Sequence, residues 1–158
     1  MSVEVTPRGK RGAAIPRAPG WLAAVFAGLS NVVFDLFSKQ MRVQSRPVLR
    51  LETRGGRSGR TRRTVRCWFP DRDGSWLIVA SLAGAARHPA WFHNLARNPD
   101  RAWVEFPGGE RIRVGAESLR GTEREEAWTR VITLAPGYAK YQGQTDRIIP
   151  VVRLKRVG

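Results

Sequence analysis

The hydrophobic pattern of the first forty residues predicts a helix behind an unpatterned start. Residues 1–19 are rich in Pro, Gly and Arg and show no apolar period, so we expect a flexible basic tail there. In the apolar stretch that follows, Asn31, Asp35 and Arg42 recur at helical spacing together with Ser38 or Lys39. Polar residues at this spacing leave an apolar stripe on the opposite face. The pattern therefore predicts an amphipathic helix over residues 20–42.

From residue 45 onward, short apolar and β-branched runs separated by turn residues favour strands. Two turn signals, PDRDGS and PGGE, join the second to the third and the fourth to the fifth of these runs as hairpins. The six predicted strands cover residues 48–53, 61–69, 75–81, 102–106, 110–117 and 149–155.

Two further helices interrupt the strands. The first covers residues 89–97, with Pro89 in its first turn. The second opens with Thr122 and Glu125, spaced as a capping box, and ends before Pro136. Because the helices are inserted rather than alternating with strands, the order favours an α+β fold in which mainly antiparallel strands form a small barrel. The domain is expected to cover residues 45–158.

Composition shows which broad classes the chain can belong to. Lys and Arg total 28 against 13 Asp and Glu, which gives a net charge of +15 and a general attraction to polyanions. A hydrophobic content of 42% excludes a disordered chain. The one cysteine, Cys67, excludes an internal disulfide, and no Cys/His spacing resembles a metal site. A reducing cytoplasm fits this cysteine usage.

The basic stretch LETRGGRSGRTRRT, residues 51–64, has the composition of an anion site. It holds glycines that let backbone N–H groups approach a ligand and arginines that donate forked hydrogen bonds. It matches neither a P-loop nor a dinucleotide-binding motif, and a solvated hairpin turn would look the same. Nucleic acid is disfavoured as a specific partner, because the aromatic residues lie in apolar runs typical of a core.

Few side chains suggest catalysis without a cofactor. His88 and His93 do not share a helix face, no triad is evident, and Cys67 lies in an apolar strand. If the protein is an enzyme, a cofactor is expected to carry the reaction. Tyr138 and Tyr141 are one helical turn apart and can border a flat ligand, although a core or surface position would also explain them.

Three segments in the order TRGGRSGRTRRT, IVASLAGAARHPAWFHNLARNP and PGYAKYQGQTDRIIPVV resemble the deazaflavin-dependent nitroreductase family of actinobacteria. The resemblance covers about residues 45–158, and HPAWFHNL is its most specific part. It implies a split β-barrel of flavin-reductase type. It also implies binding of reduced coenzyme F-420, whose tail carries a phosphate and a chain of glutamates.

The resemblance also implies roles for particular residues. The phosphate and carboxylates would be held by Arg54, Arg57, Ser58, Arg60 and Arg63. The deazaflavin ring would be lined by Ala80, Ser81 and Gly84 and buttressed by Pro89, Trp91 and Asn94, while Tyr138 and Tyr141 would border the substrate. The chain departs from the family at Leu82 and Ala83, where a polar residue and a glycine are common, and at Ala135, where the nitroreductases have a tyrosine.

The function that the resemblance implies is hydride transfer from the reduced deazaflavin to an electron-poor hydrophobic acceptor, such as a quinone, an enone or a nitro compound. The alternatives are an FMN-dependent reductase on the same fold and a non-catalytic protein that binds the deazaflavin or nucleic acid. The helix at 20–42 either covers the core or lies on a membrane, as in family members with an apolar N-terminal helix. A cytoplasmic location is expected, at the inner face of the cell membrane in the case that the helix lies on lipid.

Overall fold

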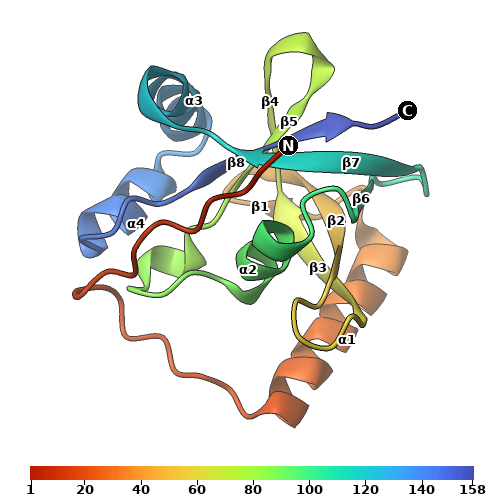
Figure 1. The fold of residues 1–158 in the computed structure, drawn as a ribbon. Helices are drawn as coiled ribbons and strands as arrows, with labels where there is room; N and C mark the ends of the chain where they lie inside the picture. The colour runs from red at the N-terminus through yellow and green to blue at the C-terminus, as the bar shows by residue number, and fades with distance from the viewer.

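The computed structural model describes residues 1–158 and confirms an α+β fold built on one curled antiparallel sheet (Figure 1). Its strands are β1 (Arg42–Val43), β2 (Arg46–Arg54), β3 (Thr61–Cys67), β4 (Phe69–Pro70), β5 (Trp76–Val79), β6 (Ala102–Glu105), β7 (Arg111–Ser118) and β8 (Val151–Arg156). They are ordered β1-β2-β6-β7-β8-β5-β4, and β3 also pairs with β2. Because Trp68 alone separates β3 from β4, the two ends of the curled sheet meet.

The six predicted strands are all present, with two differences. The strand expected at 61–69 breaks at Trp68, and a short β1 is added before β2. The helix expected to reach residue 42 ends at Phe37 instead. Its predicted last turn is replaced by a hairpin between β1 and β2, whose turn residues Gln44 and Ser45 have φ of 51° and 61°. Positive φ at both central residues is typical of two-residue hairpin turns.

The helices are α1 (Gly20–Phe37), α2 (Ala90–Arg97), α3 (Gly121–Leu134) and α4 (Gly137–Gln144). Two short 3-10 turns lie on either side of β5, η1 (Arg72–Gly74) before it and η2 (Leu82–Gly84) after it. Two helices were expected after the first, and α4 is a third. The expected capping box is wrong, because α3 begins at Gly121 and its N-terminus receives no side-chain hydrogen bond.

Each face of the sheet has an apolar core, but the outer face of β2, β6 and β7 carries charged side chains instead. The inner core lies inside the curl, where Trp91, Phe92 and Leu95 of α2 close one end. The outer core lies between the other face of the sheet and the helices α3 and α4, which contribute Trp128 and Tyr138. Strands that alternate between two buried faces explain why several runs read as almost continuously apolar.

The N-terminal segment differs from the flexible tail that the sequence predicted. Val3 is buried, the N–H of Gly9 donates to the carbonyl of Ala86 at 2.9 Å, and the N–H of Ala13 donates to the carbonyl of Gly84 at 2.8 Å. The segment thus lies across the loop that precedes α2 (Figure 1). The flexible tail was expected from the Pro and Gly content and the missing apolar period. Backbone hydrogen bonds to a neighbouring loop leave no such period in the sequence, so the sequence pattern could not reveal these contacts.

Helix α1 lies on the outer face of the sheet beside β2 and β3, and most of its apolar side chains are exposed. Phe34 is its one buried residue, and Asp35 binds Arg50 of β2 at 2.7 Å. The exposed large apolar residues of the helix are Trp21, Val25, Phe26, Leu29, Val32, Leu36 and Phe37. Its length and composition are sufficient for a membrane span, although one such helix near the N-terminus is weak evidence. The interpretation that α1 covers the core is therefore supported at Phe34 and not along the rest of the helix.

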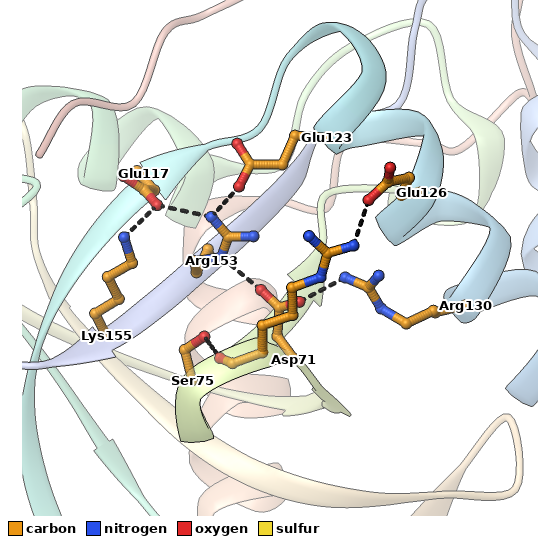
Figure 2. Close-up of polar contacts among 9 residues, drawn as sticks. Asp71, Ser75, Glu117, Glu123, Glu126, Arg130, Arg153 and Lys155 are labelled. Atoms are coloured by element: carbon orange, nitrogen blue, oxygen red, sulfur yellow. Dashed lines mark hydrogen bonds and ion pairs between the residues drawn. The ribbon is translucent and has the colours of Figure 1, made fainter.

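A buried ion-pair network fastens α3 to the sheet (Figure 2). The carboxylate of Asp71 has no exposed surface and lies 2.5 Å from the Nε of Arg153 in β8 and 2.5 Å from the Nη2 of Arg130 in α3. Arg153 also binds Glu117 at 3.1 Å and Glu123 at 2.5 Å. Burial raises the pKa of Asp71, but the hydrogen bond from Arg153 and the surrounding positive charges outweigh it and leave that pKa lowered.

Candidate functional site

The β2–β3 turn, residues 55–60, presents arginines that have no carboxylate partner. The turn is closed by a hydrogen bond from the Gly55 N–H to the Arg60 carbonyl at 2.8 Å. The Ser58 hydroxyl accepts a hydrogen bond from the Arg60 N–H at 3.3 Å, so this hydroxyl lies within the turn. Arg57 and Arg60 are exposed and form no ion pair. The turn can therefore offer its guanidinium groups to an external anion.

Asn94 in α2 fastens this turn to the barrel. Its Oδ1 accepts from the Gly56 N–H at 3.1 Å, and its Nδ2 donates to the Thr53 hydroxyl at 3.2 Å. A Cβ at Gly56 would lie 2.5 Å from the Cδ of Arg97, so glycine permits the close approach of α2. The amide of Asn94, which the resemblance places beside a cofactor ring, thus also holds the β2–β3 turn.

Arg54 and Arg63 lie on the outer face of the sheet and differ in their partners. The Nε of Arg63 lies 3.1 Å from a Glu52 oxygen, and Arg111 binds the other oxygen at 2.8 Å. Burial raises the pKa of Glu52, but the bonds from Arg111 and Arg63 lower it by more. Arg54 donates to the Thr61 hydroxyl at 2.7 Å and has no carboxylate partner. Arg63 thus belongs to the ion pairs of the sheet, and Arg54 is available to a ligand.

The loop after β5, residues 80–85, is held by the buried guanidinium of Arg147. Its Nη2 donates to the carbonyls of Ala80 at 3.1 Å and Ser81 at 2.8 Å, and its Nε donates to the carbonyl of Ala85 at 2.8 Å. Burial lowers the pKa of Arg147 to about 10, so the group remains charged at neutral pH. One side chain therefore fixes three carbonyls of the segment expected to line a cofactor ring.

His88 links Arg147 to the N-terminal segment. Its Nδ1 lies 3.2 Å from the Nη1 of Arg147, and its Nε2 lies 2.8 Å from the Thr6 carbonyl. Because a guanidinium can only donate, Nδ1 accepts and the ring proton is on Nε2. Burial lowers the pKa of His88, and the positive charge of Arg147 lowers it further. The imidazole is thus neutral and structural, and no group of three or more His, Cys, Asp or Glu residues gathers into a metal site.

The same loop contains three successive residues with positive φ. Leu82 has φ of 41°, Ala83 of 47° and Gly84 of 79°. A non-glycine residue in this region costs roughly 1–2 kcal/mol. A Cβ at Gly84 would lie 2.8 Å from the Tyr141 carbonyl, so the loop packs directly on α4. Leu82 and Ala83 therefore hold the loop in this conformation at a cost in backbone strain.

The two tyrosines of α4 meet edge to face, with ring centres 5.5 Å apart, and both hydroxyl groups have partners. The Tyr138 hydroxyl lies 2.8 Å from the Sγ of Cys67, and Tyr141 accepts from the Nε2 of Gln44 at 2.7 Å. Burial and the neighbouring Cys67 raise the pKa of Tyr138, so its hydroxyl stays protonated. Tyr138 is buried and Tyr141 is partly exposed, so Tyr141 is the more accessible of the two.

Arg66 on β3 is a partly buried arginine that the sequence analysis did not single out. Its guanidinium lies 5.9 Å from the ring centre of Trp91, and its Nη2 donates to the Thr64 hydroxyl at 2.7 Å. Its Nε is buried without a hydrogen-bond partner, and burial lowers the pKa of the group. An arginine among the inward positions of an apolar strand, as in TVRCWF, is the signal that could have revealed it.

The site residues fall into two groups joined by α2. Before the N-terminal end of α2, the loop of Ala80, Ser81 and Gly84 packs at Gly84 on Tyr141 of α4, whose ring meets that of Tyr138. Pro89 precedes α2, and Trp91 in its first turn lies in the inner core, whereas Tyr138 lies in the outer core. At the C-terminal end Asn94 meets the turn with Arg54, Arg57, Ser58 and Arg60. Eight helical residues span about 12 Å, so a ligand that reaches both groups must be long and anionic at one end. A ring with a phosphorylated, acidic tail fits this arrangement.

Comparisons with known proteins identify the family of the chain. The sequence profile of the F-420H(2)-dependent quinone reductase family matches residues 37–156. An F-420H(2)-dependent quinone reductase of Mycobacterium tuberculosis is 40% identical over 114 residues, which cover 70% of this chain and 74% of the relative. A solved F-420-H2 dependent reductase is 33% identical with a TM-score of 0.62, over 70% of this chain and 95% of that one. A second solved structure, described as a domain-swapped dimer, is 28% identical with a TM-score of 0.63, over 86% of this chain and all of that one.

Proposed function

Because the chain belongs to the F-420H(2)-dependent quinone reductase family, we propose that it transfers a hydride from reduced coenzyme F-420 to an electron-poor hydrophobic acceptor. Quinones are the acceptor class in the names of its relatives, and enones and nitro compounds share their chemistry. The observation that carries the proposal is the pair of residue groups at the two ends of α2, with carboxylate-free arginines at one end. The coenzyme, when bound, supplies the hydride.

The chain's own residues would bind and orient the reactants. Arg57 and Arg60 would hold the phosphate and the first carboxylates of the tail, and the loop fixed by Arg147 would position the ring. Tyr141 would border the acceptor, while Tyr138, protonated and bound to Cys67, would shape the pocket wall. The proton that completes the reduction would come from solvent.

Exchanging Arg57 and Arg60 together for glutamine is expected to weaken coenzyme F-420 binding about tenfold or more and to flatten its salt dependence. Each guanidinium would contribute a charge-assisted hydrogen bond to the tail, and such bonds at an exposed site are screened by salt. Tryptophan fluorescence titration of the full chain at low and moderate salt measures both effects. An unchanged affinity would remove the turn from the site. The control is Arg72→Gln with Arg120→Gln, which removes the same charge from exposed positions elsewhere.

The same titration separates the alternatives. FMN carries fewer anionic groups than the deazaflavin tail, so a preference for FMN would assign the chain to a different cofactor class. Binding of the deazaflavin without turnover of a quinone such as menadione would make the protein a carrier. Binding of neither cofactor, together with retention of oligonucleotides, would favour the nucleic-acid alternative.

Arg66 would act on the acceptor. Hydride addition to a quinone leaves negative charge on an oxygen, and a guanidinium with no carboxylate partner is suited to stabilise it. Arg66→Met is expected to lower kcat about 100-fold. The affinity for F-420 should be retained, and the midpoint of unfolding should be retained or rise. The retained midpoint distinguishes this role from a structural one. A loss of stability with kcat unchanged would show that Arg66 only packs against Trp91.

Helix α1 would place the reductase at the inner face of the cell membrane, from within the cytoplasm. Its exposed apolar residues lie beside the cations Lys39 and Arg42, as in helices that lie in a bilayer interface. Leu29→Glu is expected to reduce co-sedimentation with vesicles of phosphatidylglycerol and phosphatidylcholine about tenfold, because burying a leucine stabilises binding by about 1.5–3 kcal/mol. Gln40→Glu, an exposed polar position, is the matched control. Equal binding of both variants would exclude this role for α1.

A further inference from the structure

The outer face of the sheet carries an open hollow of about 530 Å³ beside the β2–β3 turn. It is lined by Arg54, Gly55, Gly56, Gly59, Asn98, Arg101, Trp103 and Arg113. Its residues come from the end of β2, the turn, the loop between α2 and β6, and the strands β6 and β7. The hollow therefore begins where the anion-binding turn ends.

The strand register explains why these side chains converge. Trp103 stands opposite Glu52 on one neighbour and opposite Arg113 on the other, so the three project from one face of the sheet. Arg54 is two residues beyond Glu52 on the same strand and lies on the same face, 5.9 Å from the Trp103 ring centre. The tryptophan thus forms a floor between Arg54 and Arg113.

The arginines of the hollow have no carboxylate partner, because the acids of this face are already bound. Glu52 is shared by Arg63 and Arg111, and Glu105 is bound by Arg50. Within the hollow, Arg113 donates to the backbone carbonyl of Asp100 at 3.4 Å. The side chain of Asp100 is within ion-pair distance of none of the three arginines that line the hollow.

Three guanidinium groups around a tryptophan floor, with no acid in the lining, form a site for an extended polyanion. A volume of about 530 Å³ lies in the range of small-molecule sites and exceeds what a single carboxylate needs. The ligand enters from the turn, because Gly55 and Gly56 belong both to the turn and to the lining. A chain of carboxylates attached to a group held at the turn meets each of these requirements.

We propose that this hollow binds the distal glutamates of the coenzyme tail, with Arg101 and Arg113 as binding residues in addition to those of the turn. The inference rests on the proposed function, since it deepens the same binding site. It assigns the tail a direction: away from α2, over Trp103 and toward β7. A free oligophosphate shares the chemistry of the tail and is the other source of anions that the hollow could take.

The experiment compares F-420 without glutamates and F-420 with a long oligoglutamate tail, each titrated into the full chain by tryptophan fluorescence at several salt concentrations. The wild-type chain is expected to bind the long-tailed form about tenfold more tightly and with a steeper salt dependence. Arg101→Gln with Arg113→Gln is expected to abolish this advantage and to leave the affinity for the tail-free form unchanged. Arg72→Gln with Arg120→Gln, in the turn between β4 and β5 and just before α3, is expected to retain it.

The outcomes separate the inference from the proposed function. A long-tail advantage that survives in the Arg101 and Arg113 variant overturns the inference while the proposed function stands. If the wild-type chain binds neither form, the proposed function fails and the inference fails with it. Tripolyphosphate is titrated in parallel. If its binding is lost in the variant while tail length makes no difference, the hollow takes free anions and the tail assignment is overturned.

Discussion

Replacement of Arg147 by glutamine is expected to lower the free energy of unfolding by about 3 kcal/mol and to weaken F-420 binding. The change removes the Arg147 donors from the carbonyls of Ala80, Ser81 and Ala85, although the Ser81 carbonyl keeps its hydrogen bond from the Gly84 N–H at 3.0 Å. A buried carbonyl left without a partner costs about 1–3 kcal/mol. Arg147 is a buried charge without a carboxylate partner, and its removal relieves a desolvation cost. We therefore expect a smaller loss of stability than the lost hydrogen bonds alone would give. Urea unfolding measures the change.

A matched variant separates the loop effect from the loss of an arginine in general. Arg87→Gln removes a guanidinium that donates to one carbonyl, that of Ile15 at 2.8 Å, and is expected to cost less than about 1.5 kcal/mol. Arg147→Lys retains the charge without the planar fork and should fall between the two. If Arg147→Gln were as stable as the wild-type chain, the loop would have to be held by its contacts with α4 instead.

Replacement of Asp71 by asparagine is expected to have a similar or larger effect, about 3–5 kcal/mol, without direct influence on the coenzyme site. The carboxylate is fully buried between Arg130 and Arg153, and its loss leaves Arg153 at the centre of the network without its buried partner (Figure 2). Asp73→Asn, at an exposed position of the same turn with φ of 56°, tests the substitution itself and should be nearly neutral, since asparagine tolerates that conformation.

The Asp71 network also predicts the response to acid. The pKa of Asp71 is lower in the folded chain than its ordinary value, so its contribution is present above the unfolded pKa of about 3.9 and is lost as the pH falls through the folded pKa. Wild-type stability should therefore fall steeply below about pH 4, and Asp71→Asn should flatten that part of the curve. Equal slopes for the two proteins would contradict the assignment. Thermal unfolding from pH 2 to pH 7 provides the measurement.

The sequence by itself determined the class of fold and the class of cofactor. The alternation of apolar runs with PDRDGS and PGGE fixed the strands and their antiparallel hairpins, because side-chain period and turn chemistry are local properties. The segments that resemble the deazaflavin family identified the cofactor class, which the family match confirms. The exposed arginines of the turn were found from composition, since a glycine-rich turn between strands can hardly be buried.

The tertiary structure alone decided which arginines are free to bind a ligand. Arg63 was expected at the cofactor, but the strand register places it beside Glu52; the same register leaves Arg113 without an acid and brings it to the hollow beside Arg54. The N-terminal segment likewise finds its partners in a loop more than seventy residues away, so no local pattern reveals it. An ion pair between strands depends on which residues the sheet sets opposite one another, and that is a property of the assembled sheet and not of either segment.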